Sequence, residues 1–195
     1  MSTLGIFTQF GKLHTDEQRT VEAAIAVAER AYCFQSNFPV GAALIAVNAD
    51  GHSKLFAGCN VENQSFPATI CAERNAATTA IAEGYTRFTH VAVFCKKYPG
   101  GSPCGLCRQV LREFGCDAVL LNICDRDNNV RRGHVCELLP APSILQRDRL
   151  VRPSSPAALA VRKQRATGQA DPGTRPGVVH AFSEASMMRT SSALT

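Results

Sequence analysis

The fold and the chemistry of this sequence are decided by two short segments, Cys71-Ala72-Glu73-Arg74 and Pro103-Cys104-Gly105-Leu106-Cys107. Together they supply three thiols and one carboxylate, and the C-x-x-C spacing of the second segment is typical of metal ligands. A C-x-x-C pair alone also fits a redox pair, half of a structural zinc ribbon, or two unrelated core cysteines. The additional C-x-E pattern favours a metal site.

The number of available ligands indicates the kind of metal site. A structural zinc ion takes four protein ligands, whereas a catalytic zinc ion takes three and keeps its fourth position for water. Cys71, Cys104 and Cys107 would leave that position open, and Glu73 could stand beside the water instead of ligating. Zinc lowers the pKa of its water to about 7, and a nearby carboxylate can accept the proton and pass it on.

The length and composition predict one folded domain with an extension. At 195 residues, of which 45% are hydrophobic, the chain can bury one core but has little room for a second. We expect this domain to span residues 1–150. Residues 151–195 are rich in Pro, Ser and basic residues and poor in large apolar ones, which predicts a basic, low-complexity, flexible tail.

The distribution of charge argues against nucleic-acid binding by the folded part. The net charge is +5, but residues 151–195 hold six Lys or Arg against two acids and so account for +4. The rest of the chain is near neutral, whereas nucleic-acid-binding domains carry a basic face.

The nine cysteines and the N-terminal sequence predict a reducing, cytoplasmic location. The chain opens without a basic segment followed by a long apolar run, so we expect neither a secretory signal nor a membrane span. Three cysteines are the metal-ligand candidates. We expect the other six to be small buried hydrophobic residues, namely Cys33, Cys59, Cys95, Cys116, Cys124 and Cys136.

The first sixty residues predict one helix and one hairpin. Thr15 begins a capping box with Gln18, and apolar residues at spacings of three and four predict a helix over residues 16–33. Residues 40–47 form an apolar run that ends before an Asp-Gly turn, and a second strand is expected over residues 54–61.

Asn60 and Glu62 follow at the end of that second strand. Side chains two apart in an extended segment share a face, so this amide and this carboxylate could together hold a vicinal diol. The alternative is that both are ordinary polar residues at a strand end.

The two metal-binding segments each begin a predicted helix. Helical composition covers residues 71–83, before Gly84, and residues 104–114, before Gly115. Three thiolates around Zn²⁺ leave a net negative charge, which the partial positive charge of two helix N-termini would offset. We predict that Arg74 assists by donating hydrogen bonds to the ligating thiolates; the alternative is a surface ion pair.

Three further segments predict the remaining strands. Residues 88–96, 117–124 and 130–136 are short and rich in β-branched or apolar residues. Because helices alternate with strands, the central strands should run parallel, with helices on both faces of one sheet. The expected fold class is therefore α/β, with a mixed five-stranded sheet.

The motifs resemble those of one enzyme family. Residues 69–76 (Thr-Ile-Cys-Ala-Glu-Arg-Asn-Ala) and 102–109 (Ser-Pro-Cys-Gly-Leu-Cys-Arg-Gln) are similar to the zinc segments of cytidine deaminases, the free-nucleoside enzymes of pyrimidine salvage. The resemblance runs from about residue 15 to Pro140. It implies a three-layer α/β/α cytidine deaminase-like fold, one Zn²⁺ per subunit, and a homotetramer, with a homodimer as the alternative.

The resemblance also implies how a substrate is held. Asn60 and Glu62 match residues that hold the ribose hydroxyls, and Phe38 matches a residue that packs on the pyrimidine ring. Backbone groups of Ala72 and Ser102 match those that read the carbonyl and the amine of the ring.

The implied reaction is hydrolytic deamination of cytidine or deoxycytidine. Glu73 would deprotonate the zinc water, the hydroxide would attack C4 of the cytosine ring, and the same carboxylate would protonate N3 and then the departing amine. The products would be uridine or deoxyuridine and ammonia. The sequence does not favour either nucleoside over the other.

The sequence departs from the family pattern in two places. Residues 137–140 resemble the start of the family's last helix, but the aromatic residue that usually follows is absent, so Ile144 or Leu145 would have to fill its place near a neighbouring subunit. Phe34-Gln35 replaces the family's Pro-Tyr, which removes a tyrosine expected at a subunit contact.

Two other functions share the metal motif. A polynucleotide deaminase would need an open groove with basic and aromatic side chains beside the pocket, whereas the positive charge here lies mostly in residues 151–195. A non-catalytic zinc module would need a fourth protein ligand, which the motif spacing does not supply.

Overall fold

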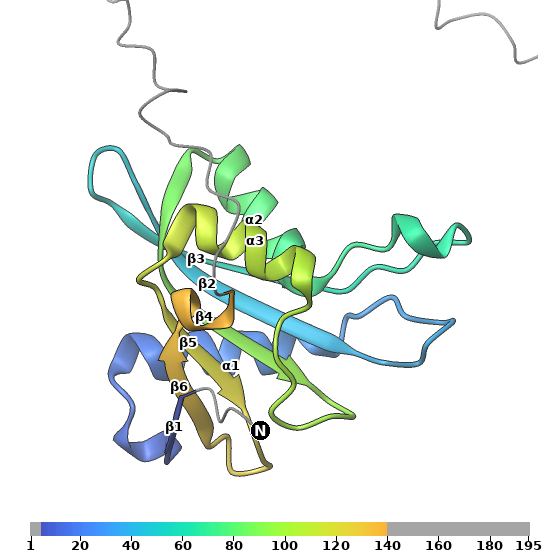
Figure 1. Ribbon diagram of the computed structural model, residues 1–195, viewed down its shortest axis with the longest axis horizontal. Coiled ribbons are helices and arrows are strands. Elements are labelled where there is room, and N and C mark those ends of the chain that lie inside the picture. The colour runs from blue at the N-terminus through green and yellow to red at the C-terminus, as the bar shows by residue number, and fades with distance from the viewer. Residues whose placement is uncertain (1–4, 140–195) are drawn as a thin grey trace, which may run out of the picture. The chain divides into compact units, whose positions relative to one another are not determined.

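The computed structural model describes residues 5–139. These residues form one mixed sheet with helices on both of its faces (Figure 1). Six strands follow one another across the sheet in the order β1-β6-β5-β4-β2-β3. Their bounds are β1 (Ile6–Thr8), β2 (Val40–Asn48), β3 (Ser53–Cys59), β4 (Tyr85–Cys95), β5 (Val119–Ile123) and β6 (Val130–His134).

The predicted arrangement of the central strands is confirmed. β4 and β5 pair in parallel, with His90 opposite Val119 and Val93 opposite Asn122. β2 pairs antiparallel with β3 on one side and with β4 on the other. The turn between β2 and β3 contains Gly51 with a φ of +86°, a conformation that glycine adopts without a steric penalty.

The predicted number of strands was one too low. β1 pairs antiparallel with β6, with Ile6 opposite Arg132 and Thr8 opposite Val130. A strand of three residues is too short to show an alternating pattern, and both apolar side chains of this edge strand are exposed, Ile6 by 77% and Phe7 by 54%. No burial signal therefore marks it in the sequence.

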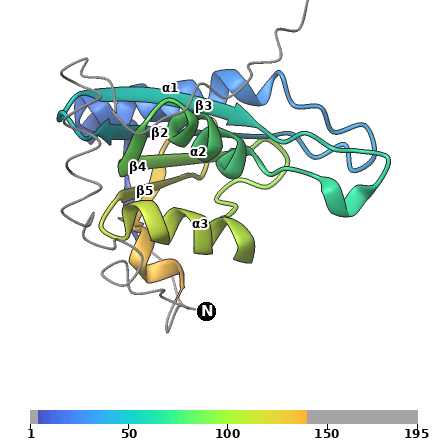
Figure 2. The same cartoon turned by 90° about the horizontal axis from the view of Figure 1, so that it is seen from above.

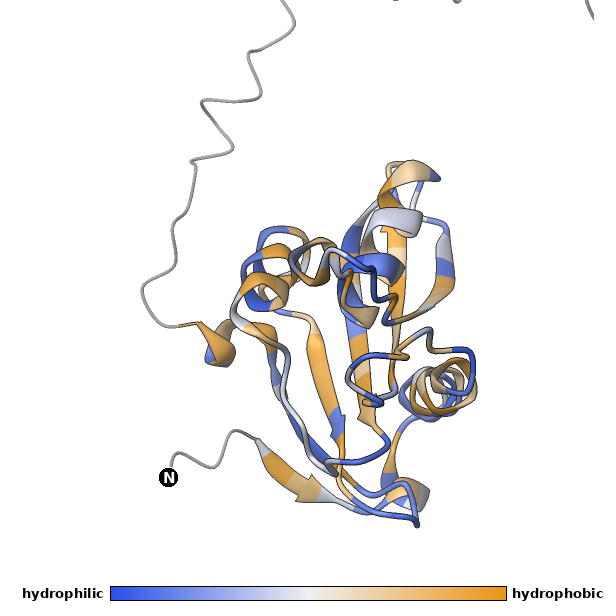
Figure 3. Cartoon of the chain, turned by 90° about the vertical axis from the view of Figure 1, so that its right-hand side faces the viewer, coloured by the Kyte–Doolittle hydropathy of each residue, from blue (hydrophilic) through white to orange (hydrophobic). Residues whose placement is uncertain are grey.

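The helices divide between the two faces of the sheet, as Figure 2 shows. On one face α1 (Thr15–Ala28) packs Val21 and Ala24 against apolar residues of the sheet that include Ala92. On the other face α2 (Ala72–Ala82) and α3 (Gly105–Gly115) cover a separate apolar cluster. The buried strands β2 and β5 and the second half of β4 are mostly apolar, and Figure 3 colours the hydrophobic residues of the chain orange.

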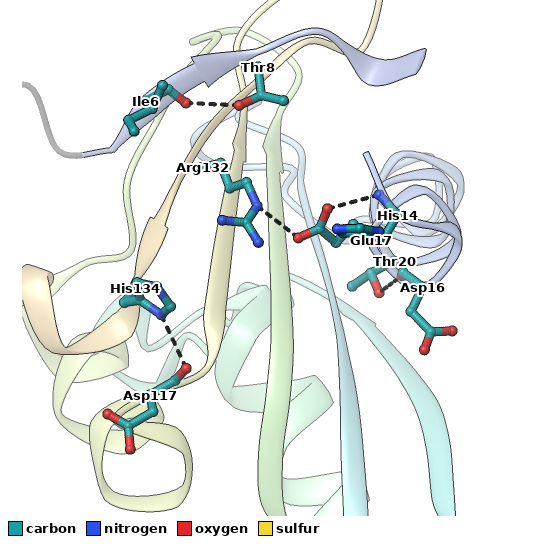
Figure 4. Close-up of polar contacts among 9 residues, drawn as sticks. All are labelled: Ile6, Thr8, His14, Asp16, Glu17, Thr20, Asp117, Arg132 and His134. Carbon is teal, nitrogen blue, oxygen red and sulfur yellow. Dashed lines mark hydrogen bonds and ion pairs between the residues drawn. The ribbon is translucent and has the colours of Figure 1, made fainter. Parts of the chain in front are cut away.

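Helix α1 differs from its prediction at both ends. Its N-cap is His14, not Thr15, and the capping box closes through Glu17, whose carboxylate accepts a hydrogen bond from the His14 backbone N–H at 3.0 Å. The same carboxylate also accepts a hydrogen bond from Arg132 Nε at 2.8 Å, which ties α1 to β6 (Figure 4). This second contact comes from a distant strand and has no local sequence signal.

The helix also ends earlier than residue 33, at Ala28. The chain leaves the helix because its next residues pair with the segment that carries Asn60 and Glu62. The Tyr32 backbone N–H donates to the Asn60 carbonyl at 3.0 Å, and the Glu62 N–H donates to the Tyr32 carbonyl at 2.7 Å. Tertiary pairing thus overrides local helix propensity here.

Two glycines allow helices to approach the sheet closely. A Cβ on Gly41 of β2 would lie 2.0 Å from the Ala24 carbonyl oxygen of α1. A Cβ on Gly58 of β3 would lie 2.5 Å from the Ala76 nitrogen of α2. The position of α2, whose N-terminus carries Cys71 and Glu73, therefore depends on the missing side chain of Gly58.

The described part of the chain ends in a short 3₁₀ helix, η3 (Val135–Leu138). The predictions for Ile144, Leu145 and the tail at 151–195 lie outside the described residues. Within residues 5–139, no helix combines the length and the apolar character needed to cross a bilayer.

Candidate active site

The three predicted metal ligands meet where two helices begin. Cys71 is the N-cap residue of α2, Cys104 is the N-cap residue of α3, and Cys107 lies in the first turn of α3. The Sγ atoms of Cys71 and Cys104 are 3.7 Å apart, and those of Cys104 and Cys107 are 3.5 Å apart. All three sulfurs lie within 4.8 Å of one another.

These sulfurs fit a zinc ion. Zn–S bonds of about 2.3 Å at tetrahedral angles place two sulfurs about 3.8 Å apart, close to the spacing in this site. Among residues 5–139, no fourth His, Cys, Asp or Glu ligand atom joins this group. The donor set is therefore that of a site with one position left for another ligand.

Glu73 lies beside the thiols in the first turn of α2 and is only 5% exposed. Burial raises the pKa of its carboxyl to about 7, because the charged form is removed from water. Its own backbone N–H opposes this rise, and the negative charge of Cys71 adds to it. A carboxyl with such a pKa can accept and donate protons near neutral pH.

Arg74 contacts the ligand cluster from the side of α2. Its Nη2 donates to the Thr69 carbonyl at 2.9 Å and lies 3.7 Å from Cys71 Sγ. The pKa of Cys71 falls to about 5, first because the Cys107 thiol donates to its sulfur and then because Arg74 does. The contact of Arg74 with one of the three sulfurs agrees with its predicted placement.

A pocket of about 240 Å³ opens beside Glu73 and the thiols. Six of the residues predicted to act on the metal or the substrate share this pocket with Glu73. Of the predicted set, the pocket is lined by Phe38, Asn60, Cys71, Ala72, Glu73, Ser102 and Cys104. Its remaining lining residues, for which the sequence indicated no role, are Val40, Thr69, Val93 and Cys95. They are uncharged residues of β2, β4 and the loop before α2, so no chemical pattern marks them.

Asn60 and Glu62 share a buried face, as the spacing of two predicted, while Val61 between them is exposed. The Asn60 side chain accepts a hydrogen bond from the Val40 N–H at 2.8 Å and donates to the Phe38 carbonyl at 3.0 Å. These contacts hold the loop that brings Phe38 to the pocket. Asn60 therefore both lines the pocket and supports one of its walls.

Glu62 lies outside the lining of the pocket and is 4% exposed. Its carboxylate accepts hydrogen bonds from the backbone N–H groups of Gln35 at 2.8 Å and Ser36 at 3.1 Å, and from the Ser36 hydroxyl. Burial alone would raise the pKa of Glu62, but these hydrogen bonds outweigh it and hold the pKa below its ordinary value. In this structure Glu62 fastens the loop that precedes Phe38.

Five of the six remaining cysteines differ from their prediction, which was burial. Cys95 is buried, but Cys33, Cys59, Cys116, Cys124 and Cys136 are partly exposed. All nine are free thiols. Their positions near loops and strand ends, which the sequence does not mark, account for the exposure.

Comparison with known proteins agrees with this geometry. A family model described as the cytidine and deoxycytidylate deaminase zinc-binding region matches residues 14–123. The chain belongs to this family. The matched residues include all three clustered cysteines and Glu73, and the family carries zinc, which the donor set fits.

Individual members of the deaminase family are similar over most of their length. The cytidine deaminase of Mycoplasma genitalium is 40% identical over 114 residues, which is 58% of this chain and 84% of that protein. The crystal structure of cytidine deaminase from Burkholderia pseudomallei is 40% identical with a TM-score of 0.57, covering 67% of this chain and 99% of that chain. The structure from Mycobacterium tuberculosis is 30% identical with a TM-score of 0.54, covering 68% of this chain and 100% of that chain.

Proposed function

We propose that this chain hydrolyses cytidine and deoxycytidine to uridine and deoxyuridine, with release of ammonia. The observation that carries the proposal is the buried Glu73 carboxyl, which lines a pocket together with the thiols of Cys71 and Cys104. The reaction consumes one water and exchanges the amine at C4 of the ring for an oxygen. A proton acceptor beside the attacking water is what this chemistry requires.

In this proposal Cys71, Cys104 and Cys107 hold the zinc ion. When bound, the ion acts as a Lewis acid that lowers the pKa of a coordinated water to about 7. The N-termini of α2 and α3 and the Arg74 guanidinium stabilise the thiolate form of the ligands. Arg74 thus supports the metal site without occupying a ligand position.

Glu73 moves the protons. Because its pKa lies near 7, the carboxylate can accept a proton from the attacking water and then protonate N3 of the ring. It next accepts the second proton of that water and delivers it to the departing amine, which leaves as ammonia. Glu73 is only 5% exposed, which limits exchange of these protons with bulk water.

The pocket walls position the base and the sugar. Phe38, Ala72 and Ser102 line the pocket, which supports packing of Phe38 on the pyrimidine ring and reading of its carbonyl and amine by the Ala72 and Ser102 backbone. Asn60 also lines the pocket, which supports a contact with the ribose. For Glu62, which is held by Gln35 and Ser36, contact with the ribose requires one of its oxygens to accept a further hydrogen bond.

A free nucleoside suits this pocket better than a polynucleotide. The volume of about 240 Å³ lies just below the usual range for ligand pockets, about 300–1,000 Å³, and no lysine or arginine of residues 5–139 lines the pocket. The test is ammonia release from cytidine, deoxycytidine and a cytosine-containing oligonucleotide by the zinc-loaded protein. We expect turnover of both nucleosides and none of the oligonucleotide; preferential turnover of the oligonucleotide would contradict the proposal.

The proposal extends to a homotetramer, with a homodimer as the alternative. Segments 31–34 and 61–70 lie together, since Tyr32 bridges to Val61 and Val61 to Ile70. They expose a group of apolar side chains, among them Tyr32 by 59% and Phe34 by 53%. Exposed apolar side chains on neighbouring segments support a role for this region in a subunit interface.

Sedimentation equilibrium can test this assembly. We expect Phe34→Ser to weaken it, whereas the control Ile6→Ser, on an edge strand that is also exposed, should not. A wild-type protein that remains monomeric at high concentration would exclude the assembly.

The proposal also includes the location and domain organisation. A cytoplasmic location suits a site that needs three reduced thiols. Residues 1–150 form the deaminase domain, and residues 151–195 form a tail outside the catalytic machinery. In support, 67% of this chain already covers 99% of the Burkholderia pseudomallei deaminase.

A further inference from the structure

A second group of metal-ligating side chains lies away from the pocket. The ligand atoms of Cys116, Asp117 and Cys136 all lie within 4.8 Å of one another. None of these residues lines the pocket. The two cysteines are half-buried and Asp117 is exposed, so the group is accessible to ions from solvent.

The backbone fixes the positions of these residues. β5 and β6 pair with Val119 opposite His134, and the pairing continues beyond both strands. The Val135 N–H donates to the Ala118 carbonyl at 3.0 Å, and the Cys136 N–H donates to the Cys116 carbonyl at 2.9 Å. The two cysteines, twenty positions apart in the sequence, are therefore held side by side by the sheet register.

Two neighbouring residues complete the environment. His134 Nδ1 lies 3.2 Å from the Asp117 backbone carbonyl oxygen, so the imidazole stands at the edge of the group (Figure 4). Arg112 Nη1 donates to the Cys136 carbonyl at 3.0 Å and so helps to fix the backbone that carries this thiol. Burial and the nearby Cys116, Glu137 and Asp117 raise the pKa of the Cys136 thiol, so metal binding has to displace its proton.

We propose that Cys116, Asp117 and Cys136 bind a zinc ion and that the neighbouring His134 turns to supply the fourth ligand. Two thiolates, a carboxylate and an imidazole are the donors of a closed, tetrahedral, structural zinc site. Thiolates disfavour magnesium and calcium, which prefer oxygen ligands. Tetrahedral ligation needs sulfurs about 3.8 Å apart, so the three clustered ligand atoms have to move closer by about 1 Å, which their partly exposed side chains can do by rotation. His134 lies outside that 4.8 Å group and has to turn toward it.

The ion would act as a structural clamp on α3. Cys116 follows the last turn of α3, whereas Cys104 and Cys107 lie at its other end. Eleven residues of helix span about 16 Å, so the clamp is too distant to touch substrate. It would tie the end of α3 to the start of η3 and stabilise the folded state by binding only to it.

The test is a zinc titration of chelator-treated protein, with bound zinc per chain and cytidine turnover measured on the same samples. We expect wild-type protein to bind two zinc ions per chain while turnover reaches its plateau with the first. Cys116→Ser/Cys136→Ser should bind one ion with unchanged turnover. The control Cys33→Ser/Cys124→Ser, which removes two partly exposed thiols outside both groups, should still bind two.

A milder variant keeps the test valid if the double cysteine variant fails to fold. Asp117→Asn keeps the size of an exposed side chain and should weaken only the second binding event, by at least tenfold. Cobalt(II) should report the same loss through its thiolate-to-metal absorption. A wild-type protein that binds one ion, or a Cys116→Ser/Cys136→Ser protein that binds two, overturns the proposal. Loss of two titratable thiols without a second metal would identify a disulfide there instead, and would also overturn it.

Discussion

Replacement of Gly58 by alanine should displace the active site through the packing of β3 on α2. The new Cβ would lie 2.5 Å from the Ala76 nitrogen and 2.8 Å from the Ala72 carbonyl oxygen, whereas ordinary contacts begin at 3.4 Å. Helix α2 would have to move by 0.6 to 0.9 Å, the differences between those distances. Both contacted atoms are backbone atoms, so no side chain can rotate away.

This displacement has two expected consequences. Overpacking of this size costs about 1–3 kcal/mol of unfolding free energy. Because Glu73 lies in the first turn of α2, a shift of nearly 1 Å should also lower kcat/KM for cytidine by about 100-fold. Thermal unfolding and steady-state ammonia release measure the two effects.

Gly11→Ala is the matched control, because a Cβ at Gly11 meets no atom within 4 Å. It should keep both the stability and the activity of the wild type. If Gly58→Ala has the same thermal stability and the same kcat/KM as Gly11→Ala, the close approach of α2 to Gly58 does not position the active site.

Three further predictions concern the loop and the ligand shell. Ser36→Ala removes a hydroxyl that donates to Glu62, so it should loosen the loop before Phe38. KM for cytidine should rise several-fold with little change in kcat. An unchanged KM would show that Glu62 does not position the pocket wall. The pKa of Glu62 is lower in the folded state than its unfolded value of about 4.3. The Glu62 carboxylate therefore stabilises the fold fully above that unfolded pKa, and this stabilisation is lost as the pH falls through the folded pKa. The acid decline of Tm should therefore be shallower in Glu62→Gln than in wild type, and parallel declines would refute this. Arg74→Gln should raise the pKa of Cys71 from about 5 in the metal-free protein, followed by thiolate absorbance, and weaken zinc binding; unchanged titration and activity would remove this role.

Much of the site was predictable because its parts are local. The C-x-E and C-x-x-C segments each begin a helix, so the thiols and the carboxyl are fixed by a few adjacent residues. The parallel pairing of β4 and β5 follows from the alternation of strands and helices. Short-range sequence patterns therefore predict both the centre of the site and the layers of helices and strands around it.

The features that the sequence did not predict depend on distant partners. β1 forms by pairing with β6, where Ile6 lies opposite Arg132. Helix α1 ends early because Tyr32 pairs with Asn60 and Glu62. The adjacency of Cys116 and Cys136 comes from the same β5–β6 register. Such pairings join residues far apart in the sequence and leave no periodic signal near either partner.

The most direct measurement of the central claim is cytidine turnover by Glu73→Ala, with zinc content measured on the same sample. Glu73 is placed beside the three sulfurs without joining them, so the variant should keep the zinc content of the wild type. Loss of the proton carrier should lower kcat by about 100-fold to 10,000-fold. A variant that keeps its zinc and releases ammonia at nearly the wild-type rate would contradict the account.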